Sequence, residues 1–372
     1  MQPPELSNAA PTGHQHSALM TLIRRQIAQA GGWLPFDRFM ALALYAPGMG
    51  YYANDLRKFG HMPDSGSDFV TAPELSPWFG RALAVQVAQA LAHTHTDAVW
   101  EFGAGTGALA KQLLDALGDQ VQRYTIVDLS GQLRERQRET LHAHAHKVQW
   151  VDSLPDVMHG VVVGNEVLDA MPVQLLMRRN GVWHERGVVW HDADDALQHE
   201  DRPTDLRPPV EIEGAHDYLT EIHPQAQAFV RTLADRLQQG AAFLIDYGFP
   251  EAEYYHPQRH MGTLMCHQLH RADPDALRDV GAKDITAHVD FTGIALAAQE
   301  AGMQVLGYTS QAHFLINCGL PSLLTDADFA PCVAAQKLIT EHEMGELFKV
   351  IALGTSAWEP LGFASGDRTH RL

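Results

Sequence analysis

The sequence is poor in cysteine and in long apolar runs. Its 372 residues contain three cysteines, Cys266, Cys318 and Cys332, which lie far apart and show no paired spacing. This usage fits a reducing compartment and argues against a zinc site, so we expect buried thiols. No apolar stretch reaches the roughly 20 residues needed to cross a bilayer, and we therefore expect no membrane span.

Positive charge is also scarce. Lys and Arg number 27 against 45 Asp and Glu, which gives a formal net charge of -18, and no basic block of the kind that follows phosphates is present. This balance argues against a nucleic-acid partner. An acidic surface suits a basic partner such as a cationic peptide segment, although excess acid also keeps a protein soluble.

Metal motifs and targeting segments are missing as well. Among the 22 histidines, His142, His144 and His146 come nearest to a ligand spacing, but no Glu completes a His-Glu-x-x-His pattern, so we expect no metal. The first 17 residues have neither a basic-then-apolar signal pattern nor an arginine-rich amphipathic one. We expect a flexible tail over residues 1–16 and a cytoplasmic location; a mitochondrial one would mean that the N-terminus is misread.

What the chain does have is a glycine-rich turn between an apolar strand and a helix, within residues 98–110. Gly103, Gly105 and Gly107 carry no Cβ, so the backbone can turn sharply and approach a ligand closely. Glu101, just before the turn, would repel a pyrophosphate but suits the cationic methionine end of S-adenosylmethionine. The turn therefore favours S-adenosylmethionine over a dinucleotide.

A dinucleotide remains the competing interpretation of this turn. Spelled Gly103-x-Gly105-x-x-Ala108, it is close to the fingerprint in which a pyrophosphate rests on a helix N-terminus. That interpretation predicts a nicotinamide-dependent oxidoreductase. A third class, a non-catalytic assembly factor on the same scaffold, also stays open.

Three further apolar runs end in polar residues and follow the glycine turn in order. Asp128 ends the first, about twenty residues after the glycines, where such folds place the acid that accepts from ribose hydroxyls. Asp152 and Ser153 end the second, and Asn165 and Glu166 end the third. Because the carboxyl ends of parallel strands share one edge, an α/β sheet with helices on both faces would gather these groups beside the cofactor.

The remaining segments suggest the organisation of the chain. We expect an N-terminal helical cap and an active-site loop over residues 17–95, then the main domain over 96–360, and a C-terminal tail over 361–372. Composition changes predict insertions at about 172–214, with an Asn180-Gly181 hairpin turn, and at about 250–285. The insertions and the N-terminal helices offer surfaces for a homodimer, although no heptad seam is visible.

Six strings follow one another along the chain: residues 68–76 (DFVTAPELS), 101–107 (EFGAGTG), 165–172 (NEVLDAMP), 244–248 (LIDYG), 287–291 (AHVDF) and 345–354 (GELFKVIALG). In this order they resemble the MidA family of class I methyltransferases. The resemblance spans roughly residues 19–354. That family includes a mitochondrial complex I assembly factor that methylates protein arginine.

This resemblance implies a class I methyltransferase fold, S-adenosylmethionine as cofactor and S-adenosylhomocysteine as product. It also implies a protein substrate, with a respiratory-complex subunit as the partner type. The family's turn commonly reads Gly-Pro-Gly-Arg-Gly, whereas this chain has Ala104 and Thr106. The glycines that bind cofactor are kept, but a role of that arginine in substrate capture cannot carry over.

Arginine methylation requires carboxylates, because a guanidinium arrives charged and must be oriented and deprotonated. Glu166 and Asp169, three residues apart, are the candidate fork, and Asn165 can accept from the same group or hold the turn. Asp169 as a helix cap is the plainer alternative. His288 would add a proton acceptor if it pairs with Asp290, although a structural histidine is the simpler interpretation.

A second set of residues is predicted around the cofactor and the acceptor. Thr71 and Pro73 precede the cofactor strand on a stiff loop and are expected on the methionine end. The candidates for contact with the acceptor are Glu74, Asp246, Tyr247 and Asp290.

Overall fold

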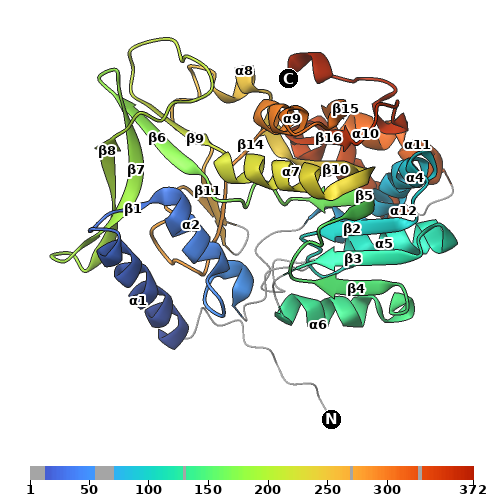
Figure 1. Ribbon diagram of the computed structural model, residues 1–372, viewed down its shortest axis with the longest axis horizontal. Helices are drawn as coiled ribbons and strands as arrows, with labels where there is room; N and C mark the ends of the chain where they lie inside the picture. Colours follow the sequence, from blue (N-terminus) through green and yellow to red (C-terminus); the bar gives the residue numbers. More distant parts are fainter. Residues whose placement is uncertain (1–12, 55–70, 129–130, 269–270, 326–328) are drawn as a thin grey trace. The chain divides into compact units, whose positions relative to one another are not determined.

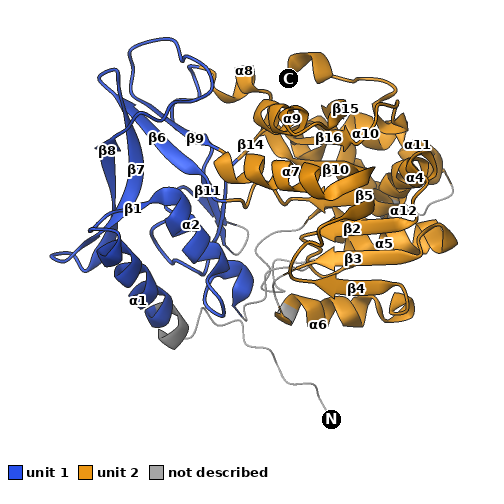
Figure 2. Cartoon of the chain, viewed as in Figure 1, with its two compact units in different colours: residues 1–70, 172–222, 257–287 blue, residues 71–171, 223–256, 288–372 orange. Residues whose placement is uncertain are grey.

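The computed structural model describes residues 13–54, 71–128, 131–268, 271–325 and 329–372 (Figure 1). The chain divides into two compact units, coloured separately in Figure 2. Unit 1 comprises residues 1–70, 172–222 and 257–287, and unit 2 comprises residues 71–171, 223–256 and 288–372. Residues 1–12 of the predicted tail and part of the predicted active-site loop lie outside the described residues. Residues 13–16, also predicted as tail, are helical and begin α1 (Gly13–Gln29).

Unit 2 is built on an eight-stranded mixed sheet (Figure 1). Its order is β15-β16-β10-β5-β2-β3-β4, and β14 pairs with β10. The run from β10 to β4 is parallel, while β16 is antiparallel to both of its neighbours. The strands are β2 (Ala98–Phe102), β3 (Arg123–Val127), β4 (Val148–Val151), β5 (Met158–Asn165), β10 (Leu237–Phe249), β14 (Val289–Asp290), β15 (Gln304–Ser310) and β16 (Phe348–Gly354).

Helices cover both faces of this sheet, because its strands are apolar on both sides. Val161 and Val163 of β5 belong to a core with α4, α5 and α10, whereas Val162 belongs to a core with α7 and α9. The predicted α/β sheet is thus confirmed. The helices of unit 2 are α3 (Ala72–Leu75), α4 (Pro77–Thr94), α5 (Ala108–Leu117), α6 (Gly131–Thr140), α7 (Pro224–Arg236), α8 (Glu251–Tyr254), α9 (Phe291–Glu300), α10 (Gln311–Asn317), α11 (Leu320–Leu323) and α12 (Phe329–Ile339).

In its described residues, unit 1 combines the α-helices α1 and α2 with antiparallel strands around its own apolar core. Its larger sheet has the order β1-β7-β6-β9, with β8 paired to β7, and a smaller sheet has the order β12-β11-β13. The elements are α1 (Gly13–Gln29), β1 (Leu34–Pro35), α2 (Phe36–Tyr45), β6 (Gln174–Arg179), β7 (Val182–His191), β8 (Ala196–Pro203), β9 (Tyr218–Ile222), β11 (Met265–Gln268), β12 (Arg271–Asp273) and β13 (Asp284–Thr286).

The predicted hairpin is confirmed. Arg179 pairs with Val182, so Asn180 and Gly181 form a two-residue turn. Their φ angles of 48° and 77° fit the left-handed turn that suits the twist of the flanking strands. Within the insertion predicted at about 172–214, residues 196–203 form the strand β8, because they complete the ladder with β7.

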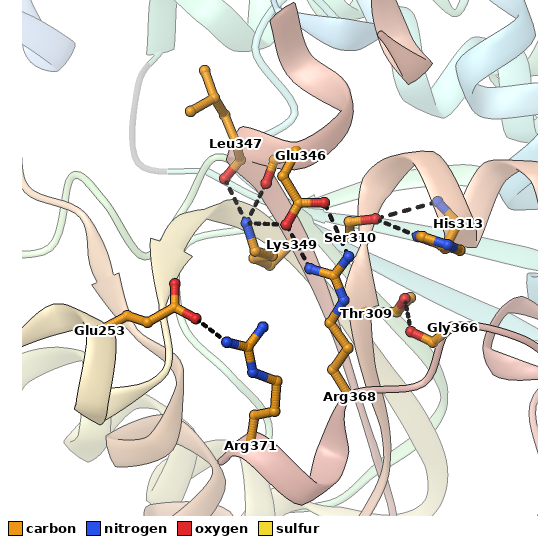
Figure 3. A network of polar contacts seen from close by, with 10 residues as sticks. All are labelled: Glu253, Thr309, Ser310, His313, Glu346, Leu347, Lys349, Gly366, Arg368 and Arg371. Carbon is orange, nitrogen blue, oxygen red and sulfur yellow. Dashed lines mark hydrogen bonds and ion pairs between the residues drawn. The ribbon is translucent and has the colours of Figure 1, made fainter. Parts of the chain in front are cut away.

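The C-terminal residues 361–372 lie against the outer strand β15 of unit 2. The backbone N–H of Arg368 donates to the carbonyl of Tyr308, and the backbone N–H of Tyr308 donates to the Asp367 carboxylate. These contacts cover an otherwise open strand edge. The ion pairs that hold the segment are Arg368–Glu346 and Arg371–Glu253 (Figure 3).

Among the described residues, no helix has the length and apolar character required to span a bilayer. The predicted segment of residues 17–95 contributes to both units, with residues 17–70 in one and residues 71–95 in the other. Its role as a cap remains a prediction.

Gly160 is a point where the central strand β5 tolerates no side chain. Its φ is +121°, and a Cβ there would lie 2.2 Å from the carbonyl oxygen of Ala98 on β2. We predict that Gly160→Ala lowers the free energy of unfolding by roughly 2–6 kcal/mol, because backbone strain and overpacking add. Urea denaturation measures this loss.

The matched control is Gly131→Ala at the start of α6, where a Cβ would meet nothing within 4 Å. We expect this variant to keep the wild-type midpoint. Equal midpoints for Gly160→Ala and the wild type would show that β5 and β2 are not paired at this register.

Candidate functional site

The glycine turn joins β2 to α5 in unit 2, as predicted. All three glycines have left-handed backbone, with φ of 64° at Gly103, 51° at Gly105 and 85° at Gly107. A Cβ on Gly103 would lie 3.0 Å from the Val167 side chain, so it would be tightly packed there as well. Gly107 caps α5, whose first backbone N–H groups face the turn. This is the local geometry that receives a nucleotide-like group.

Asp128 follows β3 at the same edge of the sheet. Its backbone N–H donates to Val151 O, and its carboxylate accepts from Gln137 Nε2 at 2.8 Å. The same nitrogen donates to Gly105 O at 3.0 Å. The predicted ribose acid and the glycine turn are therefore joined through Gln137, a residue that the sequence interpretation did not single out.

Glu101 lies on β2 and is 2% exposed. Its Oε2 accepts from the Tyr124 hydroxyl at 2.8 Å. Burial raises the pKa of Glu101 to about 8, and the nearby Asp128 charge adds to this, while the Tyr124 hydrogen bond opposes it. The residue is thus a buried acid at the cofactor edge, and its predicted contact with the methionine end stays a prediction.

The loop before α4 is fastened to the glycine turn. Thr106 Oγ1 donates to the Glu74 carboxylate. Gln112 Nε2 donates to Pro73 O at 2.7 Å. Thr71 precedes α3 in extended conformation, and its carbonyl accepts from the backbone N–H of Leu75. Thr106, which stands where the family's turn commonly has arginine, therefore holds a predicted site residue.

Asn165 and Glu166 end β5, and Glu166 has an unusual backbone. Its φ is +53°, a left-handed conformation that costs a non-glycine residue free energy and often marks a functional site. Its N–H donates to Ile245 O at 2.9 Å. Asn165 Nδ2 donates to Glu166 Oε1 at 2.9 Å, whereas no residue that the structure describes is a hydrogen-bond partner of the buried Asn165 Oδ1.

Asp169 and Tyr247 are brought together from separate strand ends. The Tyr247 hydroxyl donates to Asp169 Oδ2, and Asp169 Oδ1 is buried with no hydrogen-bond partner among the described residues. Burial raises the pKa of Asp169 to about 6, although the Tyr247 hydrogen bond opposes this shift. No helix begins at Asp169, so the alternative of a helix cap does not describe it.

Asp246, three residues before the end of β10, anchors the loop after Glu166. Its Oδ2 accepts from the backbone N–H groups of Val167, Leu168 and Asp169 at 3.1, 2.9 and 3.2 Å. Burial raises the pKa of Asp246, and the negative charges of Asp169 and Glu166 raise it further. These three hydrogen bonds show that Asp246 holds the backbone of this loop. Its contact with the acceptor remains a prediction.

His288 and Asp290 lie at the start of α9. The His288 ring stacks on Phe249, with centroids 5.3 Å apart, and meets Tyr247 edge-on at 5.1 Å. Asp290 caps α9 by accepting from the Gly293 N–H at 3.1 Å, and burial raises its pKa to about 7. Their predicted action as a proton-accepting pair remains untested.

The strand ends contribute unequally to the edge. Asp152 and Ser153, which follow β4, are exposed. Lys349, a buried residue that the sequence interpretation missed, pairs with Asp246 in the β10–β16 register. Its ammonium donates to Glu346 O, and burial lowers its pKa (Figure 3). No group of three potential metal ligands occurs among the residues that the structure describes.

The buried Glu101 predicts a specific dependence of stability on pH. Its pKa is about 8 in the folded protein and near 4.5 when unfolded, so the folded state binds more protons between these values. Its contribution to stability is present below about pH 4.5 and is lost as pH rises through about 8, by at most about 1.4 kcal/mol per pH unit. Glu101→Gln should lose less stability between pH 5 and 8 than the wild type.

Urea unfolding at several pH values measures this difference. The control is Glu135→Gln, an exposed residue of α6. Parallel stability curves for the wild type and Glu101→Gln would contradict the raised pKa.

Comparison with known proteins shows which family this chain resembles in sequence and in structure. Residues 82–309 match the family described as "Putative S-adenosyl-L-methionine-dependent methyltransferase". A structure from Burkholderia thailandensis, described as a likely methyl transferase bound to S-adenosyl-homocysteine, is 50% identical, covers 100% of both chains and has a TM-score of 0.93.

More distant relatives are named protein arginine methyltransferase NDUFAF7, mitochondrial. The protein from Danio rerio is 28% identical over 88% of this chain and 85% of its own, and the human protein is 28% identical over 87% and 80%. The resemblance seen in the sequence motifs is thereby confirmed. This chain belongs to the family of S-adenosylmethionine-dependent methyltransferases.

Proposed function

We propose that this chain transfers a methyl group from S-adenosylmethionine to the guanidinium of an arginine in a protein partner. The family resemblance suggests a respiratory-complex subunit as that partner. The cofactor part draws on the glycine turn, on Asp128 and on the Burkholderia relative that was crystallised with S-adenosyl-homocysteine. The acceptor part draws on the groups at the ends of β5 and β10.

The observation that carries the acceptor proposal is a surplus of hydrogen-bond acceptors. Within the part of the chain that the structure describes, Asn165 Oδ1 and Asp169 Oδ1 are both buried without a hydrogen-bond partner, and the Glu166 carboxylate lies between them in sequence. A guanidinium has five N–H donors and no acceptor, so it complements such a set. Both oxygens are inaccessible to solvent in this structure, so binding of a guanidinium would require the Asn165 or Asp169 side chain to rotate. The names of the distant relatives agree with arginine.

In methyl transfer of this kind, the protein mainly has to orient the acceptor and forms no covalent bond itself. S-adenosylmethionine, when bound, supplies a methyl group already activated by its positive sulfur. The carboxylates of Glu166 and Asp169 would orient one guanidinium nitrogen in line with that carbon. As the nitrogen–carbon bond forms and the carbon–sulfur bond breaks, the nitrogen loses a proton. Asp169, with a pKa of about 6, is suited to receive it near neutral pH.

Cofactor preference separates this function from an oxidoreductase. We predict that calorimetric titration gives binding heat with S-adenosylmethionine and with S-adenosylhomocysteine but none with NAD. Asp128→Asn should weaken S-adenosylhomocysteine binding about tenfold, because a charged hydrogen bond to the ribose is lost.

The matched control is Asp119→Asn, whose exposed side chain pairs with Lys147. This variant should bind like the wild type. Binding heat with NAD and none with S-adenosylmethionine would contradict the proposal and favour the oxidoreductase.

Glu166 is the residue that we expect to matter most for transfer. Glu166→Ala should lower the rate of radiolabelled methyl incorporation into lysate protein by about 100-fold or more, while S-adenosylmethionine affinity changes less than about twofold. Glu135→Ala, an exposed change on α6, is the control and should label normally.

Three results would count against parts of this account. Equal labelling by Glu166→Ala and the wild type would remove Glu166 from the mechanism. Label found only in small molecules would exclude a protein acceptor. Cofactor binding without any transfer would favour the assembly-factor alternative.

A further inference from the structure

Gln137 is a fully buried glutamine that joins three parts of unit 2. It lies on α6 and is 0% exposed. Its Nε2 donates to Gly105 O at 3.0 Å and to Asp128 Oδ2 at 2.8 Å, while its Oε1 accepts from Trp150 Nε1 at 2.8 Å. One side chain therefore connects the glycine turn, the end of β3 and the strand β4.

The orientation of this amide is determined by its partners. A carboxamide has two donor hydrogens on nitrogen and one acceptor oxygen. Gly105 O and the Asp128 carboxylate can only accept, and Trp150 Nε1 can only donate, so the reversed amide would oppose like groups at all three contacts. Fully satisfied buried networks of this kind hold their members in a single arrangement.

The surroundings of Gln137 leave it little freedom to move. A Cβ on Gly107 would lie 3.4 Å from Gln137 Cα, so the turn and α6 are in close contact. One turn earlier on α6, the Arg134 guanidinium donates to the backbone carbonyl of Asp128. Two side chains of α6 thus hold Asp128. Arg134 binds the backbone carbonyl of Asp128, and Gln137 binds its carboxylate.

We propose that Gln137 is the positioning residue that orients the Asp128 carboxylate for the ribose hydroxyls of the cofactor. This inference rests on the proposed function and extends it to ligand selectivity. A carboxylate offers about four acceptor sites, so it can take the Gln137 amide and a ribose diol together. Since the amide fixes the rotation of the carboxylate, preference for a ligand with an intact ribose depends on Gln137.

The test compares two ligands that differ only at the ribose. One is S-adenosylhomocysteine, and the other is its 2′,3′-dideoxy analogue. We expect the wild type to prefer S-adenosylhomocysteine by about tenfold or more. Gln137→Met, which keeps the size but removes the amide, should weaken S-adenosylhomocysteine binding about five- to twentyfold and the analogue less than about twofold. The preference for the ribose should therefore collapse.

The control is Gln149→Met on β4, which removes a glutamine hydrogen bond to Thr125 of β3 and leaves Asp128 untouched. It should keep the wild-type preference. Trp150→Phe removes the donor that orients the Gln137 amide and should reduce the same preference more weakly; it decides the question if Gln137→Met does not fold.

The outcomes separate the two levels of the proposal. An unchanged preference in folded Gln137→Met, or in Trp150→Phe as its replacement, would overturn this inference alone. Equal binding of both ligands by the wild type would also overturn it. A wild-type protein that binds neither ligand would overturn the proposed function and this inference with it.

Discussion

Parallel pairing of β10, β5, β2, β3 and β4 is the constraint on which the site depends. Because parallel strands end at one edge, this order places the glycine turn, Asp128, the Asn165–Glu166 pair and Asp246 along the same rim of unit 2. The apolar cores on both faces favour this order, since the central strands β10, β5 and β2 are buried on two sides. The gathering of these polar groups at one rim therefore follows from how the sheet is packed.

The rim holds more buried acid than stability alone would favour. Glu101, Asp169 and Asp246 are all buried, and burial raises the pKa of each. Each is held by a named donor: the Tyr124 hydroxyl, the Tyr247 hydroxyl and three backbone N–H groups. Removing carboxylates from water costs free energy that such bonds offset only in part. Clusters of this kind are typical of sites that bind or transfer charge.

The sequence predicted what is local and missed what depends on distant contacts. The glycine turn, the strand ends and the Asn180–Gly181 hairpin follow from spacing and residue type, and all three are present. By contrast, β8 lies in an acidic segment without strand periodicity and forms because β7 offers it a partner. Gln137 gave no signal, because its partners lie 32, 9 and 13 residues away and α6 reads as an ordinary polar helix. The anchoring role of Asp246 likewise spans 77 to 79 residues.

We propose that the glycine turn and Asp128 together bind the adenosyl group of S-adenosylmethionine. The most direct test is a crystal structure of this chain, determined from a crystal soaked with S-adenosylhomocysteine. We expect density for the adenosine beside Gly103–Gly107, with both ribose hydroxyls within hydrogen-bond distance of the Asp128 carboxylate. Density elsewhere on the chain, or a ribose that points away from Asp128, would contradict it.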